Sequence, residues 1–154
     1  SRDLSKQTFF PNRWMDGEKE LTNLMVVASS DKNGNPSLNS NYGAKELDLF
    51  APGMDIYSSY MGDTYQTGSG AGLSSATVAG VAALIKAYYP NLTGSQIRDI
   101  LLKTVTSRKG VEVEKGIVVN NKQAQDLFLF EDLCLSGGIL NAYQAIMAAD
   151  KLAK

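Results

Sequence analysis

The chain has 154 residues, which is enough for one domain of ordinary size. Its 15 Lys and Arg residues nearly balance 16 Asp and Glu residues, so no basic excess predicts binding to nucleic acid or to an anionic membrane. The sequence contains no histidine, which excludes Ser-His-Asp catalysis, Cys-His catalysis and histidine-ligated zinc within the chain itself. We expect no membrane span, because Gly80 and Lys86 interrupt the longest apolar stretch.

Short strands are predicted in the first half of the chain. Residues 24–28 and 47–51 are brief apolar runs typical of buried strands, and residues 56–60 predict a third strand. Asn33 and Gly34 form a dipeptide typical of a hairpin turn. Residues 1–21 are polar and irregular, and we expect them to follow the surface.

Helices are predicted mainly in the second half. Residues 76–88 are apolar almost all the way round, which is typical of a helix buried in a core. Residues 93–96 form a capping box for a second helix with one apolar face, and Asn141 caps a last helix. Between these helices, residues 106–135 predict an irregular or β excursion, with an edge strand at 111–114.

The stretch from Thr67 to Leu84 bears most directly on function. It reads TGSGAGLSSATVAGVAAL and, without gaps from Ser69 to Gly80, resembles the nucleophile motif of the subtilase family, S-G-T-S-M-A-x-P-x-V-A-G. A glycine-rich turn lets a substrate approach the backbone closely. The helix that follows offers free N–H groups and a positive dipole end, and the nucleophile's own N–H helps to hold the oxyanion.

The resemblance to subtilases extends well beyond this motif. Residues 40–53 are similar to the family segment F-S-x-x-G…D-x-x-A-P-G, and residues 138–142 are similar to G-x-x-N/D-A at the start of its last helix. Together with the intervening helix, these similarities cover residues 24–104 and 136–150. The resemblance implies an α/β fold, namely the C-terminal portion of a subtilisin-like three-layer α/β/α domain with a buried central helix from about 72 to 88. It also implies a peptide or protein as substrate or ligand.

The departures from the family motif concern the catalytic groups. Gly72 stands where the family has its serine nucleophile, and Ala71 stands where the family prefers Thr. The family's Asp and His motifs and its oxyanion Asn belong to an N-terminal half that residues 1–154 do not include, so we expect a partial domain that needs this half as a partner. Without that half, we expect one side of the central helix to lack partners. Only the backbone N–H of Gly72 would remain as an oxyanion donor. By resemblance, Gly70, Ala71, Phe9 and Phe10 are candidates for substrate contact, although packing is the simpler role for the two phenylalanines.

Other serines near the motif are poor substitutes for the nucleophile. If Ser74 were aligned with the family's nucleophile, the connection between the motif and the helix would be two residues shorter, and the helix would be rotated by about 200°. We therefore expect Ser74 and Ser75 to be small helix-packing residues, and Ser69 to belong to the turn.

Three interpretations of function stay open. The chain is a natural pseudo-protease that binds peptides or acts as a scaffold, a protease-derived chain that was inactivated on purpose, or an unrelated structural α/β domain. As written, we expect no peptidase activity. The start at Ser1 suggests a processed or trimmed product, and the family resemblance implies a secreted or extracytoplasmic protein.

The remaining polar residues predict no metal or cofactor site. Asp31, Asn33 and Asn35 have the spacing of a calcium loop, but Pro36 replaces the glycine that such a loop requires, so a turn is expected. Cys134 lies between two leucines and is expected to be a buried structural thiol. The charges at 18–20 and at 112–115 are expected to be solvated.

Overall fold

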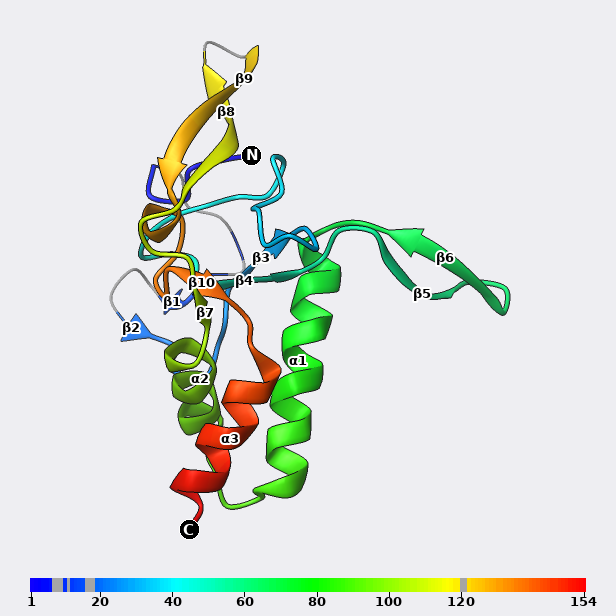
Figure 1. The fold of residues 1–154 in the computed structure, drawn as a ribbon, viewed down its shortest axis with the longest axis vertical. Helices are drawn as coiled ribbons and strands as arrows, with labels where there is room; N and C mark the ends of the chain where they lie inside the picture. Colours follow the sequence, from blue (N-terminus) through cyan, green and yellow to red (C-terminus); the bar gives the residue numbers. More distant parts are fainter. Residues whose placement is uncertain (7–9, 11, 16–18, 120–121) are drawn as a thin grey trace.

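The computed structural model describes residues 1–6, 10, 12–15, 19–119 and 122–154, and its centre is a mixed four-stranded sheet (Figure 1). The strand order is β3-β4-β10-β7. β4 pairs in parallel with β3 on one side and with β10 on the other, and β7 pairs antiparallel with β10. The bounds are β3 (Val27–Ser30), β4 (Leu49–Pro52), β7 (Thr106–Ser107) and β10 (Gly138–Ile139).

Three helices pack beside the sheet, namely α1 (Ala71–Tyr88), α2 (Gly94–Lys103) and α3 (Ala142–Leu152). A short 3₁₀ helix, η1, spans Phe130–Asp132. Both predicted caps are confirmed. Thr93 and Gln96 form the reciprocal capping box of α2, and the Asn141 side chain accepts a hydrogen bond from the first turn of α3.

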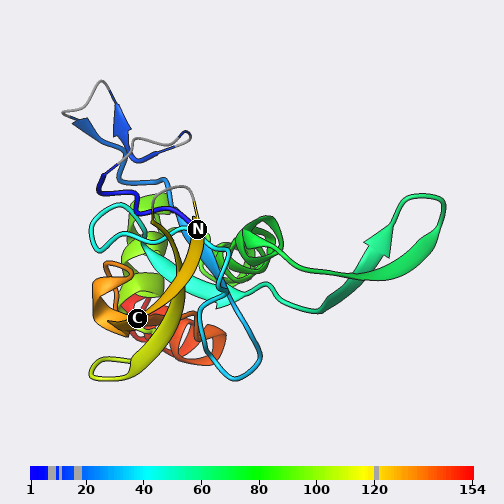
Figure 2. The ribbon, with the colours of Figure 1, turned by 90° about the horizontal axis from the view of Figure 1, so that it is seen from above.

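The remaining strands form hairpins. β5 (Ile56–Tyr60) and β6 (Thr64–Gly68) form a hairpin that projects from the body beside the start of α1 (Figures 1 and 2). β8 (Glu112–Val119) and β9 (Lys122–Leu129) form a longer one near the N-terminus, and β1 (Trp14–Met15) pairs with β2 (Lys19–Glu20). The predicted edge strand at 111–114 is therefore the start of a full hairpin.

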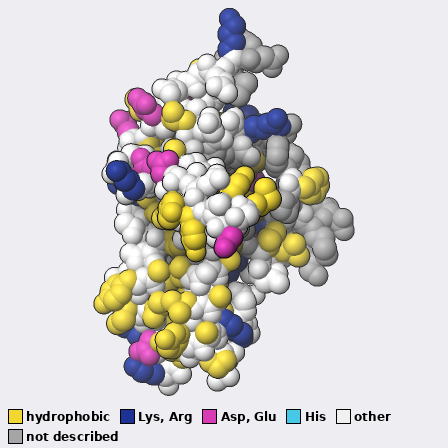
Figure 3. All heavy atoms as spheres, turned by 90° about the vertical axis from the view of Figure 1, so that its right-hand side faces the viewer, with side chains coloured by type: hydrophobic (Ala, Val, Ile, Leu, Met, Phe, Trp, Pro, Cys, Tyr) yellow, Lys and Arg dark blue, Asp and Glu magenta, His cyan; other side chains and the backbone are white. Residues whose placement is uncertain are grey.

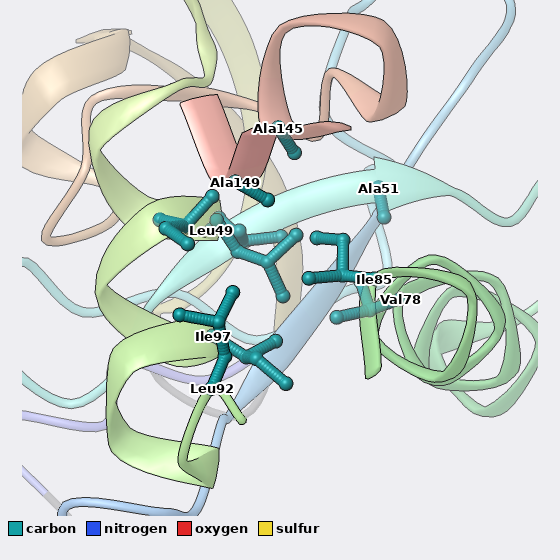
Figure 4. Packing of buried hydrophobic residues seen from close by; sticks show 10 residues of the cluster. Leu49, Ala51, Val78, Ile85, Leu92, Ile97, Ala145 and Ala149 are labelled. Carbon is teal, nitrogen blue, oxygen red and sulfur yellow. The ribbon is translucent and has the colours of Figure 1, made fainter. Parts of the chain in front are cut away.

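Side chains alternate across β4 and build two cores. Leu49 and Ala51 point toward the helices and pack with Val78 and Ile85 of α1 and with α2 and α3 (Figure 4). Phe50 points to the opposite face, where its ring meets that of Phe130 at a centroid distance of 5.1 Å. The strands are thus covered on both faces, which confirms the α/β fold class.

The central helix lies where it was predicted, but it is buried on one face only. Ser74, Val78 and Ile85 are its buried residues, whereas Leu84 and Tyr88 are 42% and 73% exposed. Figure 3 faces this side and shows hydrophobic side chains gathered on its surface. The expectation of burial all round is therefore wrong for this chain, because the sheet, α2 and α3 contact a single side of the helix. The exposure of Leu84 and Tyr88 agrees with the expectation that one side of the helix lacks partners.

By length and composition alone, α1 is also long and apolar enough to cross a membrane, and it is the one such helix among the described residues. Core helices of globular domains pass the same test. On one side α1 packs against β3, β4, α2 and α3, although only 17% of its residues are buried.

Candidate functional site

The glycine-rich motif forms the sharp turn into α1. Gly70 is the N-cap of the helix, with a φ of 154° and no side-chain cap. Its N–H donates to the Gly53 carbonyl at 2.7 Å, which ties the turn to the end of β4. Gly72 is the second helical residue, so its N–H belongs to the first turn, where N–H groups have no partner within the helix.

Close packing behind this turn requires the glycine of the A-P-G segment. A β-carbon at Gly53 would lie 1.9 Å from Ser74 Oγ and 2.8 Å from the Gly70 carbonyl oxygen. Ser74 is fully buried, and its hydroxyl donates to the Ala51 carbonyl at 3.0 Å. The first turn of α1 is therefore held directly against β4, and the prediction that Ser74 is a packing residue is confirmed.

A serine side chain would fit at position 72, which we predict to correspond to the nucleophile position of the family. A β-carbon built on Gly72 meets no packed neighbour within 4 Å among the described residues. Ser69, by contrast, is used in the turn, because its hydroxyl accepts a hydrogen bond from the Asp55 N–H at 2.9 Å. Ser75 is exposed on α1.

A cavity of about 570 Å³ lies beside this turn. It is lined by β3, by segment 37–41 and by Ser69–Ala71, so it opens between the sheet and the start of α1. Among the described lining residues the only ionisable side chain is Glu46. The wall otherwise combines apolar side chains with hydroxyl and amide groups, a mixture typical of small-ligand and peptide pockets.

The structure brings most of the predicted contact residues to this cavity. Gly70, Ala71 and Phe10 line it, and the Phe10 side chain is 82% exposed. Gly72 is the next residue of α1 after Ala71, but it is not among the residues that line the cavity. Phe9 lies outside the described residues. The roles assigned to these residues stay predictions.

The buried carboxylate of the family segment 40–53, Asp48, has a structural role. Asp48 is fully buried, and its Oδ1 lies 2.8 Å from Arg13 and 3.0 Å from Arg98. Its Oδ2 accepts the Val26 N–H at 2.7 Å. Glu20, expected to be solvated, joins the cluster at 3.1 Å from Arg98. These bonds leave Asp48 no role as a catalytic base.

The main residue that sequence reasoning missed is Lys115. It was expected to be solvated, yet it is fully buried on β8. Its ammonium group donates to the carbonyls of Ser37 at 2.8 Å, Leu38 at 3.0 Å and Ser40. Burial lowers the pKa of Lys115 to about 8, while the carbonyl oxygens favour the charged form that donates to them. The signal in the sequence was weak: a lysine on the inward side of an alternating strand.

Two other predictions can be checked here. Cys134 is buried and free, and burial raises the pKa of its thiol, so a structural role is confirmed. Asp31 accepts the N–H groups of Asn33 and Asn35, which confirms a turn in this segment. Within the described part of the chain, no group of three His, Cys, Asp or Glu residues is placed to hold a metal ion.

The end of the parallel strand β4 meets the turn into α1 beside the cavity, and ligands of α/β sheets commonly bind near the carboxyl ends of parallel strands. Comparisons with known proteins agree. Residues 9–125 match the subtilase family, Peptidase_S8. The chain belongs to the subtilase family.

Individual relatives support this assignment. The chain is 38% identical to subtilisin BL of Lederbergia lenta over 102 residues, which cover 66% of this chain and 38% of that protein. It is 42% identical to subtilisin DY of Bacillus licheniformis over 84 residues, covering 54% of this chain and 30% of that protein. The structure of the prenylagaramide maturation protease PagA matches with a TM-score of 0.60 at 26% identity, covering 80% of this chain and 42% of that one. The chain therefore spans less than half the length of these relatives.

Proposed function

We propose that this chain is the C-terminal half of a subtilase domain that binds peptide at the start of α1 without cleaving it. The observation that supports the proposal is the location of Gly72, which aligns with the family's nucleophile in the motif and lies in the first turn of α1 beside a cavity of about 570 Å³. The family relationship supports peptide as the ligand, and supports an extracytoplasmic location.

The proposed lack of cleavage follows from the chemistry of the residues present. Gly72 has no hydroxyl that could form an acyl-enzyme, and the sequence has no histidine to act as base. Backbone N–H groups and binding alone leave a residual acceleration of about 10³–10⁴ over water. That rate is far below protease turnover, so binding is the activity that the site can retain.

We further propose that the missing half of the domain covers the exposed face of α1. Leu84 and Tyr88 are large apolar side chains on that face, and contiguous exposed apolar surface marks an interaction site. The greater length of the relatives supports an N-terminal half as the occupant. A tight, cooperative monomer of the 154-residue chain in sedimentation experiments, with no dye-binding apolar surface, would count against this proposal.

Peptide binding can be tested on the full chain with fluorescein-labelled casein peptides. We expect an anisotropy increase without release of fragments. Ala71→Leu places a larger side chain in the cavity and should weaken binding by about tenfold or more, as expected for a blocked pocket. Ala79→Leu is the matched control, since Ala79 is exposed on the same helix and outside the cavity lining. Absence of binding by the parent chain, or equal effects of both variants, would refute a peptide site here.

The nucleophile position needs a separate experiment in a domain completed with its N-terminal half. Gly72→Ser, combined with Ala71→Thr, should become labelled by a fluorophosphonate probe, because a serine side chain has room at this position. The parent should stay unlabelled. Labelling of the parent at Ser69, Ser74 or Ser75 would show that the motif alignment is wrong. Failure of the restored domain to label would favour a natural pseudo-protease over a deliberately inactivated enzyme.

A further inference from the structure

Lys115 carries a buried positive charge that is stabilised by hydrogen bonds to backbone carbonyls rather than by an ion pair. Its ammonium group contacts three backbone carbonyls, those of Ser37, Leu38 and Ser40, and the Ser1 hydroxyl at 3.0 Å. Among the described residues no carboxylate forms an ion pair with it. Burying an ammonium ion is costly unless hydrogen bonds compensate. Here one short segment of backbone supplies most of that compensation.

The same segment forms a wall of the cavity at the start of α1. Ser37, Asn39, Ser40 and Asn41 all line this cavity. The Ser40 hydroxyl also accepts the Ser29 N–H at 3.1 Å, which anchors the segment to β3. Segment 37–41 therefore lies between the cavity and the ammonium group of Lys115.

The β8–β9 hairpin contacts this segment at further points. Gly116 follows Lys115, and a β-carbon there would lie 2.4 Å from the Leu38 carbonyl oxygen, so the two backbones touch. The Phe128 ring of β9 lies 5.3 Å from the Tyr42 ring, and Lys115 Nζ lies 5.6 Å from the same tyrosine ring. The hairpin stands next to the N-terminus and above the sheet (Figure 1). These contacts make it the outer support of the cavity wall.

We propose that Lys115 is a positioning residue of the peptide site: its ammonium group orients the carbonyls of segment 37–40 and so holds Asn39, Ser40 and Asn41 in the wall of the cavity. This inference rests on the proposed peptide-binding function. It assigns to the β8–β9 hairpin, none of whose described side chains lines the cavity, control over how well that site is formed. A wall that is already ordered binds a peptide more tightly, because the entropy cost of ordering it does not reduce the binding free energy.

The test removes the ammonium group and then returns it. Lys115→Ala in the full chain should weaken binding of the labelled casein peptides by about tenfold. Propylammonium contains the three carbons and the nitrogen that this change removes, so millimolar propylammonium should restore binding. Tetramethylammonium has the same charge but no N–H group and should not restore it. Lys86→Ala is the matched control, because Lys86 also donates to two carbonyls, those of Pro90 and Leu92, far along α1 from the cavity.

Hydrogen exchange separates failure of this inference from failure of the peptide-binding proposal. The amides of segment 37–41 should exchange faster in Lys115→Ala, and return toward the parent rate with propylammonium, whether or not the chain binds casein. Lys115→Met fills the same space without charge, so it keeps the test valid if the alanine variant does not fold. Unchanged exchange in segment 37–41 in the folded variant, or equal rescue by tetramethylammonium, would overturn the positioning role.

Discussion

Removal of the Asp48 charge should be among the most damaging single changes in the molecule. Asp48→Asn keeps the shape of the side chain, but it leaves the buried guanidinium groups of Arg13 and Arg98 without their shared carboxylate. The Nε atoms of both arginines already lack a hydrogen-bond partner among the described residues. Glu20 would be the remaining anion, and its side chain is 37% exposed. Removing one partner of a buried ion pair costs about 3–5 kcal/mol, a large part of the roughly 5–15 kcal/mol that stabilises a domain.

The assay is urea unfolding of the full chain followed by far-UV circular dichroism, at low and at high salt. We expect Asp48→Asn to lower the free energy of unfolding by about 3–5 kcal/mol with little dependence on salt. Glu20→Gln is the control: it removes a partly exposed charge from the same cluster and should cost less than about 1 kcal/mol, and less still at high salt. A cost below about 1 kcal/mol for Asp48→Asn would show that water or another group solvates the arginines, and would refute this reasoning.

Three further predictions concern stability. Gly116→Ala should destabilise the chain by about 1–3 kcal/mol in urea unfolding, because the new methyl group meets a backbone carbonyl. Gly80→Ala, on the open side of α1, should instead stabilise the chain by up to about 1 kcal/mol. A change of the same sign in both variants would contradict this packing. The lowered pKa of Lys115 means that, between about pH 8 and 10.5, the folded chain has released a proton that the unfolded chain keeps. The free energy of unfolding should therefore rise across this window by up to about 3 kcal/mol relative to Lys115→Met, which retains the neighbouring Tyr42 phenol; a relative fall would contradict the lowered pKa. Thr93→Ala should cost about 1 kcal/mol in thermal unfolding through loss of the capping box, and no change in the melting temperature would show that the cap adds nothing.

Local features of the fold could be predicted from the sequence because short-range chemistry determines them. The capping box at Thr93 and the cap at Asn141 need only residues within one helical turn, and both were found where expected. The start of α1 follows from a contiguous motif, and the family assignment follows from several such motifs in order. The assignment of Gly72 to the nucleophile position rests on the same motif and stays a prediction. Cys134 could be placed in the core from its apolar neighbours.

Features that join distant segments depended on the tertiary structure. Lys115 is separated by 75 residues from Ser40, whose carbonyl it binds, and the alternation of β8 alone is too weak a signal to distinguish it from a solvated lysine. Asp48, Arg13 and Arg98 likewise meet only after the chain folds. The exposed side of α1 reads in the sequence as a buried one, because apolar periodicity reports which surfaces avoid water but not whether a partner within the chain covers them. The sequence alone thus determined the family and the helix caps, since each depends on residues close together in the chain. Only the tertiary structure decided how the cavity wall is supported and which charges are buried, because those depend on long-range contacts.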